Sequence, residues 1–402
     1  MRILVINQYY PPDASAVAYM LGNLVEDLDR AHDVQVIAGR PSYNPEASAY
    51  RPQAGRVTRV HSASFARTTL PGRLVNYMSF LLLALVAACR AERPDVIVVM
   101  TDPPVVGVIG MLASVRHRRP FVQLCHDVHP DIAEALGLLR SAAISALWRW
   151  LNQLVRDRAA RIVVVGRDMA EKLAAAGCDP EKLVYVPTWA EDTTVPAQDA
   201  ARERRERGWD ESFVVMHAGN MGLAQNLDVL VDAAKHLQEH WPAARIVLLG
   251  DGAARPRIER SVQAQGLRNV EFLPHCPKEQ AARLMAAADL HVVSLIPGLW
   301  GCAAPSKTYT IMALAKPFVA SVDPDSEPAR IAVELDCGRW VPAGDAQALA
   351  TAVMDARELP LEELGARARR GFEQRYRRAH ATAAIADLLE AIVRPSRPMT
   401  AC

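Results

Sequence analysis

One stretch of the chain decides its fold: Leu290-His291-Val292-Val293-Ser294, followed after a loop by Pro305-Ser306-Lys307-Thr308-Tyr309-Thr310-Ile311-Met312-Ala313-Leu314-Ala315-Lys316-Pro317-Phe318-Val319-Ala320-Ser321. Its two ends are short runs rich in apolar residues, as buried strands are. Between them, Pro305 and Ser306 are helix start signals and Ala315-Lys316-Pro317 is a stop signal. A strand, a helix and a second strand in this order are typical of a parallel sheet.

Similar apolar runs recur along the whole chain and are separated by helical stretches, which predicts parallel sheets covered on both faces. In the first half the runs are Ile3–Ile6, Val34–Ala38, Val57–His61, Val96–Met100, Phe121–Leu124, Ile162–Val165 and Val184–Val186. In the second half they are Phe213–His217, Ile246–Leu249, Val270–Leu273, Leu290–Ser294, Phe318–Ser321 and Trp340–Val341. We therefore predict an α/β protein with two doubly wound, Rossmann-like domains that face each other across a cleft.

The two series of strands are separated by Glu191–Asp210, which has few large apolar residues and contains a charged tract at 202–207. We expect a linker with a solvated helix there, so the first domain is assigned to residues 1–195 and the second to residues 196–375. The segment Phe372–Val393 has helical spacing of its apolar residues. It could pack on either domain.

Composition narrows the class of protein. The chain has 402 residues, of which 50% are hydrophobic, and its 46 basic and 45 acidic residues leave a formal charge of +1. Bulk electrostatics therefore give no reason to expect nucleic-acid binding. Seven scattered cysteines without a C-x-x-C pair fit reduced thiols. Because the chain begins with a predicted strand and not with the pattern of a signal peptide, we expect a cytoplasmic protein.

A lysine stands where a helix would not favour one. No Asp or Glu occurs from Leu290 to Val322, and Lys307 falls in the first turn of the predicted helix. The helix macrodipole disfavours a cation there unless an anion binds beside it. We expect this anion to be the diphosphate of a nucleotide sugar, bound by Lys307 and Ser306. The alternative is an ordinary surface lysine, since the cost is only ~0.3–1 kcal/mol.

Glycine turns follow two strands of the second domain. Gly219-Asn220-Met221-Gly222 comes directly after Phe213–His217, and Gly250-Asp251-Gly252 follows the next strand. Glycine lets a backbone approach a phosphate closely, so the N–H groups of Gly219–Gly222 are expected to bind the diphosphate. The loops near Asp251 and at Pro274-His275 are expected to hold the nucleoside. Plain turns between a strand and a helix are the alternative.

Polar residues also follow a strand of the first domain, in Cys125-His126-Asp127-Val128-His129-Pro130-Asp131. His126 and Asp127 are candidates for acid/base or substrate-orienting groups. A metal site made of the two histidines and two aspartates is an alternative without regular ligand spacing. Helix capping by Asp127 or Asp131 is another. Asp323-Pro324-Asp325 resembles a metal-binding Asp-x-Asp, but we expect a turn before a helix at Glu327.

The first strand is joined to its helix by the loop Gln8-Tyr9-Tyr10-Pro11-Pro12-Asp13-Ala14-Ser15-Ala16. Its small residues permit the close approach of a ligand. Ser15 is also a candidate N-cap of the following helix, and both roles are compatible.

Together, Ile3–Pro12, the two glycine turns, Pro305-Ser306-Lys307 and Ala315-Lys316-Pro317 resemble glycosyltransferase family 4 over roughly residues 1–393. The resemblance is strongest to the bacterial branch that builds colanic acid, O-antigen and capsule. It implies a GT-B fold, retaining transfer without a metal or other cofactor, a donor in the second domain, and a last helix, within 376–402, that crosses back to the first domain. It also implies an acceptor in the first domain, where Tyr10, Ser15 and Ala16 are assigned to it.

Two departures from the family pattern concern the donor site. The usual Glu-x7-Glu pair falls on Cys302 and Thr310, and the usual basic residue after the glycine turn is Gln225. We interpret this as a variant donor site that includes Gln225 and Thr310. The expected function is transfer of a sugar from a UDP- or GDP-sugar to a lipid-linked oligosaccharide or other glycan. The alternatives are a sugar-nucleotide epimerase of the same fold and a non-catalytic partner subunit.

One helical stretch has features of a membrane-surface helix. Its apolar stripe consists of Leu74, Val75, Met78, Leu81, Leu82, Leu85 and Val86, and its flanks carry Arg67, Arg73, Arg90 and Arg93. Such a helix can lie on a bilayer, where a lipid-linked acceptor would be reached. We therefore expect peripheral contact with the inner face of the plasma membrane. A helix that covers the sheet of the first domain is the alternative.

Overall fold

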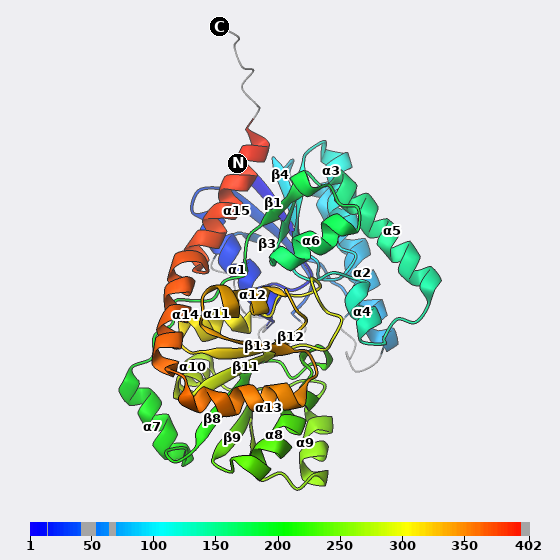
Figure 1. Ribbon diagram of the computed structural model, residues 1–402. Coiled ribbons are helices and arrows are strands. Elements are labelled where there is room, and N and C mark those ends of the chain that lie inside the picture. Colours follow the sequence, from blue (N-terminus) through cyan, green and yellow to red (C-terminus); the bar gives the residue numbers. More distant parts are fainter. Residues whose placement is uncertain (14, 42–53, 64–69, 395–402) are drawn as a thin grey trace.

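Two parallel β-sheets form the frame of the computed structural model, which describes residues 1–13, 15–41, 54–63 and 70–394 (Figure 1). Within these residues, the first sheet has seven strands in the order β3-β2-β1-β4-β5-β6-β7, and the second has six in the order β10-β9-β8-β11-β12-β13. Neighbouring strands are parallel throughout. The predicted α/β fold with two Rossmann-like domains is confirmed.

The first sheet and its helices occupy the upper part of Figure 1. Their elements are β1 (Arg2–Ile6), α1 (Ala16–Asp29), β2 (Asp33–Ala38), β3 (Arg56–Arg59), α2 (Leu70–Arg90), β4 (Val96–Val99), α3 (Gly107–His117), β5 (Phe121–Cys125), α4 (Asp131–Ala135), α5 (Ala142–Arg158), β6 (Arg161–Val164), α6 (Arg167–Ala175), η2 (Pro180–Lys182) and β7 (Leu183–Tyr185).

The second sheet and its helices lie below. Their elements are α7 (Ala197–Arg207), β8 (Phe213–Ala218), η3 (Leu223–Gln225), α8 (Asp228–His240), β9 (Ala244–Leu249), α9 (Arg255–Ala264), β10 (Val270–Leu273), α10 (Lys278–Ala287), β11 (Leu290–Ser294), α11 (Lys307–Ala313), β12 (Phe318–Val322), α12 (Glu327–Glu334), β13 (Gly338–Pro342), α13 (Ala346–Asp355), η4 (Ala356–Glu358) and α14 (Leu361–Arg375). The last helix, α15 (Arg378–Val393), lies in the upper part beside the first sheet.

Both faces of each sheet are buried, which explains the near-continuous apolar strands. In β1, Leu4 and Ile6 pack in one cluster with residues of α2 and α3. Their neighbours Ile3 and Val5 point to the other face and pack with α1 and α15. Successive side chains of a strand alternate between faces, so each strand contributes to two cores.

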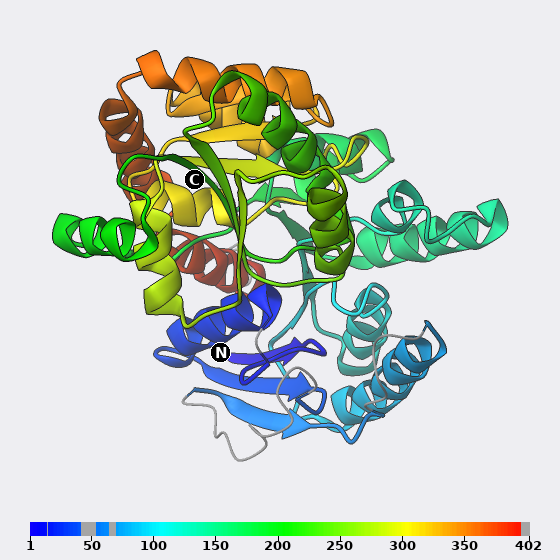
Figure 2. The same ribbon diagram turned by 90° about the horizontal axis from the view of Figure 1, so that it is seen from below.

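The last helix returns to the first domain and packs beside α1 (Figure 2). Ile385 and Leu389 are buried in the same cluster as residues of α1. Arg378 donates hydrogen bonds to Asn23, Glu26 and Asp27 of α1. The predicted helical segment Phe372–Val393 is in fact interrupted between α14 and α15.

The charged tract before the second sheet forms α7, but this helix is only partly solvated. Arg204 donates hydrogen bonds to the carbonyl of Ala287 at 2.8 Å and to the Asp289 carboxylate at 3.0 and 3.1 Å. Arg202 and Glu206 form an exposed ion pair on the helix. The expectation of a solvated helix is corrected, because one side of α7 is fixed to the second domain.

None of the helices in the described residues combines the length and the apolar character needed to cross a bilayer. The two sheets present their carboxyl edges to each other. Direct contacts across this boundary include the isolated bridge between Asp127 and Ala303 and the hydrogen bond from the Val128 N–H to the Cys302 carbonyl at 2.9 Å. Loops from both domains therefore meet at this boundary.

Candidate functional site

The site forms where the strand order of the second sheet reverses. β8 and β11 are neighbours in this sheet although two other strands lie between them in sequence. Because the chain leaves β8 toward one side and β11 toward the other, the loops after these two strands diverge and leave space for a ligand. The loop after β8 is the Gly219–Gly222 turn, and the loop after β11 leads to Lys307.

Lys307 is the first residue of α11 and is half-buried between the two loops. Its Nζ lies 3.0 Å from Nε2 of His217, which is completely buried at the end of β8. A Cβ added to Gly219 would lie 3.9 Å from the Lys307 Cε, so the glycine turn and the lysine are in contact distance. The predicted proximity of Lys307 to the first glycine turn is therefore seen in the structure.

The electrostatic surroundings of Lys307 favour an anionic ligand. Burial lowers the pKa of Lys307 to about 7, and no carboxylate in the described part of the chain offsets this effect. Burial also lowers the pKa of His217, which is neutral at physiological pH and cannot balance a positive charge. An ammonium group in this position gains most from an oxyanion bound beside it.

The two glycine turns are packed against each other. The Gly219 N–H donates to the Leu249 carbonyl at 2.9 Å, and the Met221 N–H donates to the Asp251 carbonyl at 2.8 Å. A Cβ on Gly250, whose φ is +132°, would lie 2.1 Å from the Gly219 oxygen. The expectation that the N–H groups of Gly219–Gly222 bind the diphosphate is corrected for Gly219 and Met221, because these two N–H groups donate to carbonyls at the end of β9 and in the second turn.

Polar side chains converge at the end of the first turn. A Cβ on Gly222 would lie 2.5 Å from Gln225 Oε1 and 2.9 Å from Asn220 Nδ2. The Gln225 Oε1 atom is buried and has no hydrogen-bond partner among the described residues. Both side chains thus line the turn expected to hold the donor, and Gln225 has an oxygen available there.

The other predicted donor residues lie around this centre. Ser306 is the N-cap of α11, but its side chain makes no capping hydrogen bond, and Thr310 is half-buried one turn further along the helix. Asp251 is exposed, and its carboxylate accepts a hydrogen bond from the Gly252 N–H at 2.7 Å. Pro274 and His275 are exposed beyond β10. Of these, Ser306 and Thr310 are closest in the chain to Lys307.

The position of the missing glutamate is buried. Cys302 has no exposed surface and belongs to the core of the second domain. Burial raises the pKa of its thiol to about 11, so it is neutral. This side chain cannot supply a carboxylate or a charged nucleophile to the site.

His126 and Asp127 lie at the boundary between the domains. Their N–H groups donate to the Thr101 hydroxyl at 3.2 and 3.3 Å. Burial lowers the pKa of His126 to about 4 and raises the pKa of Asp127 to about 6. His126 also lines a cavity of about 10 Å³ inside the first domain, beside Trp189. The backbone of Asp127 bridges to Ala303, so Asp127 adjoins the loop that leads to Lys307.

The alternatives for this segment are not supported by its geometry. His129 stacks on Trp148 at 5.7 Å between ring centroids, and Asp131 forms an ion pair with Lys172 at 3.6 Å. The four side chains of the possible metal site thus have separate surroundings. The N-cap of α4 is Pro130, so neither aspartate is its N-cap residue. Asp323 accepts hydrogen bonds from the N–H groups of Gly298 and Trp300, and α12 begins at Glu327 as predicted.

The predicted acceptor residues have different surroundings. Ser15 caps α1, since its hydroxyl accepts from the Ala18 N–H at 3.1 Å, and Ala16 is exposed. Tyr10 is only 2% exposed, and its hydroxyl donates to the Ala54 carbonyl. The assignment of Tyr10 to the acceptor is corrected, because its ring belongs to the core. Ala14, from the same loop, lies outside the described residues.

Sequence reasoning missed two residues that shape these sites. His217 contacts Lys307, and the only signal in the sequence is a histidine that ends an apolar run before a glycine turn. Arg59 in β3 donates to the carbonyls of Pro11 and Gly39 at 2.5 and 2.7 Å, and burial lowers its pKa. Arg59 fixes the loop after β1, but no local pattern pointed to it.

Family models match both domains. A glycosyl transferase 4-like domain matches residues 15–189, and a glycosyl transferases group 1 domain matches residues 212–358. The probable glycosyltransferase WbjE of Pseudomonas aeruginosa is 26% identical over 379 residues, covering 93% of this chain and 94% of the relative. The putative colanic acid biosynthesis glycosyl transferase WcaI of Escherichia coli strain K12 is 25% identical over 352 residues, covering 81% and 84%.

Solved structures share the fold. HepE of Anabaena in complex with UDP superposes with a TM-score of 0.75 at 18% identity, over 97% of this chain and 100% of that chain. The same protein in complex with UDP-glucose gives a TM-score of 0.72 at 19% identity, again over 97% and 100%.

We expect Lys307→Ala to weaken the binding of the productive nucleotide, UDP or GDP, by about tenfold to a hundredfold, because a charge-assisted hydrogen bond is lost. Calorimetric titration of both nucleotides checks this. Lys235→Ala, on the exposed surface of α8, is the matched control and should bind like the unmodified protein. Equal affinities of the unmodified protein and Lys307→Ala would return Lys307 to the role of an ordinary lysine.

The affinity should also depend on pH in a defined direction. Above its pKa of about 7, Lys307 is neutral in the empty site, and a bound diphosphate favours the ammonium form. Binding then takes up a proton, so affinity should fall as pH rises from 7 to 9, by at most about tenfold per pH unit. Titrations in buffers with different ionisation enthalpies measure the proton uptake. The same slope in Lys307→Ala would exclude Lys307 as its source.

Proposed function

The chain belongs to the family 4-like glycosyltransferases of the GT-B fold, and we propose that it transfers a sugar with retention from a UDP- or GDP-sugar to a lipid-linked oligosaccharide or other glycan. One observation carries the donor assignment: a half-buried lysine without a carboxylate partner in the described residues, at the switch point of the second sheet. The complexes of HepE with UDP and UDP-glucose support a nucleotide-sugar donor.

In the proposed reaction, Lys307 stabilises the diphosphate as it leaves. The bond between the sugar C1 atom and the phosphate oxygen breaks, and negative charge develops on the phosphate close to the ammonium group. A fixed cation is effective there because it needs no reorganisation during the reaction. We therefore propose that the chain needs no metal ion or other cofactor.

Retention is proposed without a protein nucleophile. Cys302 and Thr310 replace the usual glutamates, and Cys302 is buried and neutral. The acceptor hydroxyl would attack C1 on the face from which the diphosphate leaves and transfer its proton to a phosphate oxygen. Asp127, whose pKa is raised to about 6, would orient the transferred sugar or the acceptor from the first domain.

The relatives favour this function over the alternatives. WbjE and WcaI are named as glycosyltransferases and match most of the chain, which supports a transferase in polysaccharide biosynthesis. An epimerase would release an altered sugar without an acceptor, and a partner subunit would show no turnover.

Slow hydrolysis of nucleotide sugars tests the proposal. We expect the purified protein to release UDP or GDP from one sugar nucleotide without an acceptor, equally fast in EDTA, and Lys307→Ala to lose most of this activity. Chromatography of nucleotide and sugar measures it. Loss of turnover in chelator, restored by Mg²⁺ or Mn²⁺, would contradict the metal-free reaction. An isomerised sugar as product would instead identify an epimerase.

We further propose that the helices α2, α3 and α5 contact the membrane. They lie side by side over one face of the first sheet (Figure 2). Each exposes large apolar side chains. These are Val75, Met78, Leu82, Leu83 and Val86 of α2, Leu112 and Val115 of α3, and Ile144, Leu147, Trp150 and Leu154 of α5.

Helix α2 also covers the sheet. Phe80, Ala84 and Ala88 are buried in the core, and Leu81 and Leu85 of the predicted stripe pack partly against it. The remaining stripe residues whose side chains the structure describes are exposed. One face of α2 therefore covers the sheet, and the other face is available for the proposed membrane contact. Arg67 and the side chains of Arg73 and Leu74 lie outside the described residues.

The charge of this helical layer suits an anionic surface. The sequences of α2 and α3 contain no Asp or Glu, and α5 contains only Asp157. Basic residues stand near the helix ends, among them Arg90, Arg116, Arg156 and Arg158. Exposed apolar and aromatic side chains beside arginines are typical of a surface that binds anionic lipids.

Flotation with liposomes tests this contact. We expect binding to anionic vesicles at low salt, weaker binding at high salt, and a clear loss in Leu82→Glu and Trp150→Glu. Val333→Glu is the matched control, because Val333 is 68% exposed on α12, away from this layer. Absence of binding to anionic vesicles at low salt, or equal loss in the control, would rule the surface out.

A further inference from the structure

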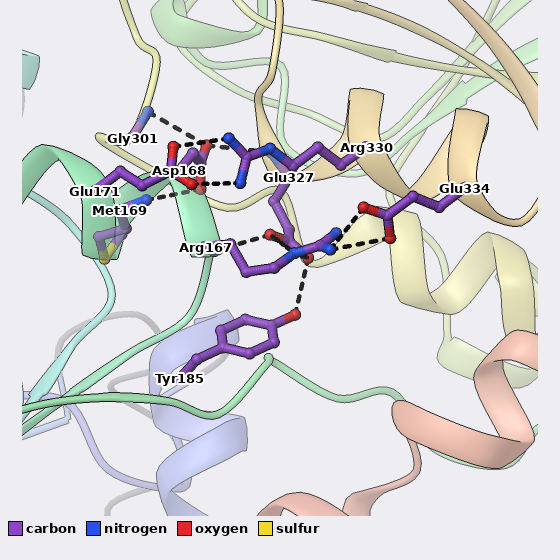
Figure 3. A network of polar contacts seen from close by, with 9 residues as sticks. All are labelled: Arg167, Asp168, Met169, Glu171, Tyr185, Gly301, Glu327, Arg330 and Glu334. Atoms are coloured by element: carbon purple, nitrogen blue, oxygen red, sulfur yellow. Dashed lines mark hydrogen bonds and ion pairs between the residues drawn. The ribbon is translucent and has the colours of Figure 1, made fainter.

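Two helix N-termini meet at the boundary between the domains. Helix α6 follows β6 of the first sheet, and α12 follows β12 of the second, so both begin at the facing carboxyl edges. Figure 3 shows the side chains between them. Two positive helix ends that approach each other repel unless negative groups lie between them. Asp168 and Glu327 supply these groups and are only 2% and 1% exposed.

The two carboxylates cap each other's helices. Glu327 accepts a hydrogen bond from the Arg167 N–H at 2.8 Å, and Asp168 accepts one from the Glu327 N–H at 3.1 Å. Asp168 also accepts from the Met169 N–H of its own helix at 2.8 Å. Each helix is thus capped by a residue of the other domain, and separating the domains would leave N–H donors of both helices unpaired.

Further contacts surround this pair of caps. The Arg167 guanidinium donates to Glu327 and Glu334, and the Tyr185 hydroxyl donates to Glu327 at 2.8 Å. At the edge of the network, Arg330 forms a two-pronged ion pair with Glu171, with both distances 2.7 Å. This outer pair joins the same two helices, and Figure 3 draws no hydrogen bond from it to Asp168 or Glu327.

Asp168 accepts a third hydrogen bond, which leads toward the donor site. It accepts a hydrogen bond from the Gly301 N–H at 3.3 Å, in the loop between β11 and α11. The next residue, Cys302, accepts from the Val128 N–H at 2.9 Å. The first domain therefore holds this loop at two adjacent points, shortly before the chain reaches Lys307.

The contact at Gly301 leaves no room for a side chain. Gly301 has a φ of +65°, and a Cβ there would lie 2.7 Å from the Asp168 carbonyl oxygen and 2.8 Å from the Lys172 Cβ. The loop and α6 are thus packed closely, and a displacement of α6 would displace the loop. Because the loop continues into α11, its position sets the position of the Lys307 ammonium.

We propose that Asp168 is a positioning residue for the donor site, acting from the opposite domain through Gly301 and Lys307. Because the reciprocal caps join the two domains, the docking of the domains and the placement of Lys307 are coupled. The inference rests on the proposed function, since it assumes that Lys307 binds the donor diphosphate. Asp168 itself does not contact the donor in this proposal.

Nucleotide binding and hydrogen exchange together test it. In Asp168→Ala we expect faster amide exchange in the peptide 299–306 and an affinity for the productive nucleotide, UDP or GDP, that is about tenfold weaker or more. Glu171→Gln removes only the outer ion pair and should leave both quantities unchanged. Gly301→Ala perturbs the same contact from the side of the loop and serves as a second variant if Asp168→Ala does not fold.

A double-mutant cycle separates positioning from a general loss of stability. If Asp168 acts through Lys307, the double variant should bind the nucleotide no more weakly than Lys307→Ala alone. Additive losses, unchanged exchange in 299–306, or faster exchange with unchanged affinity would each overturn the inference. If Lys307→Ala alone leaves affinity unchanged while exchange responds to Asp168→Ala, the donor assignment fails, and with it the role of Asp168 in binding.

Discussion

A lysine ammonium without a neighbouring carboxylate in the described residues is the constraint on which the proposed site depends. Lys307 begins a short helix, where the macrodipole disfavours a cation, and burial lowers its pKa to about 7. Its one described polar partner, His217, is neutral. Both effects favour the binding of an oxyanion beside Lys307.

The fold places this lysine where a ligand can reach it. The strand order reverses between β8 and β11, so the loops after these strands open a space at the edge of the sheet. The first domain contacts this edge of the sheet from the other side. The Asp127–Ala303 bridge and the hydrogen bonds of Asp168 connect it to the loop that precedes Lys307. The proposed donor site therefore depends on both domains, although its binding groups come from one.

The fold could be predicted from sequence because its signals are local. Each predicted strand is a short apolar run between turn or helix signals, and parallel strands buried on both faces are apolar at nearly every position. The charge at Lys307 could be predicted as well, because the helix start signals and the absence of acidic residues lie in the same stretch of sequence. The sequence from Leu290 to Ser321 thus predicts both a strand–helix–strand unit and the candidate site.

Contacts between distant residues could not be predicted in this way. Asp168 and Glu327 are 159 residues apart, and Lys307 and His217 are 90 apart, so no periodicity relates them. The family resemblance assigns Tyr10 to the acceptor, but its ring is buried, because the loop after β1 folds back onto the core. No local pattern indicates that the N–H groups of Gly219 and Met221 donate to the carbonyls of Leu249, at the end of β9, and Asp251, in the second glycine turn.

A crystal structure of the complex with UDP or GDP would show directly whether Lys307 binds the diphosphate. We expect a diphosphate oxygen within hydrogen-bond distance of the Lys307 Nζ, about 2.7–3.2 Å, beside the turn at Gly219–Gly222. A nucleotide bound elsewhere, or bound here while Lys307 contacts only His217 and no phosphate oxygen, would contradict it.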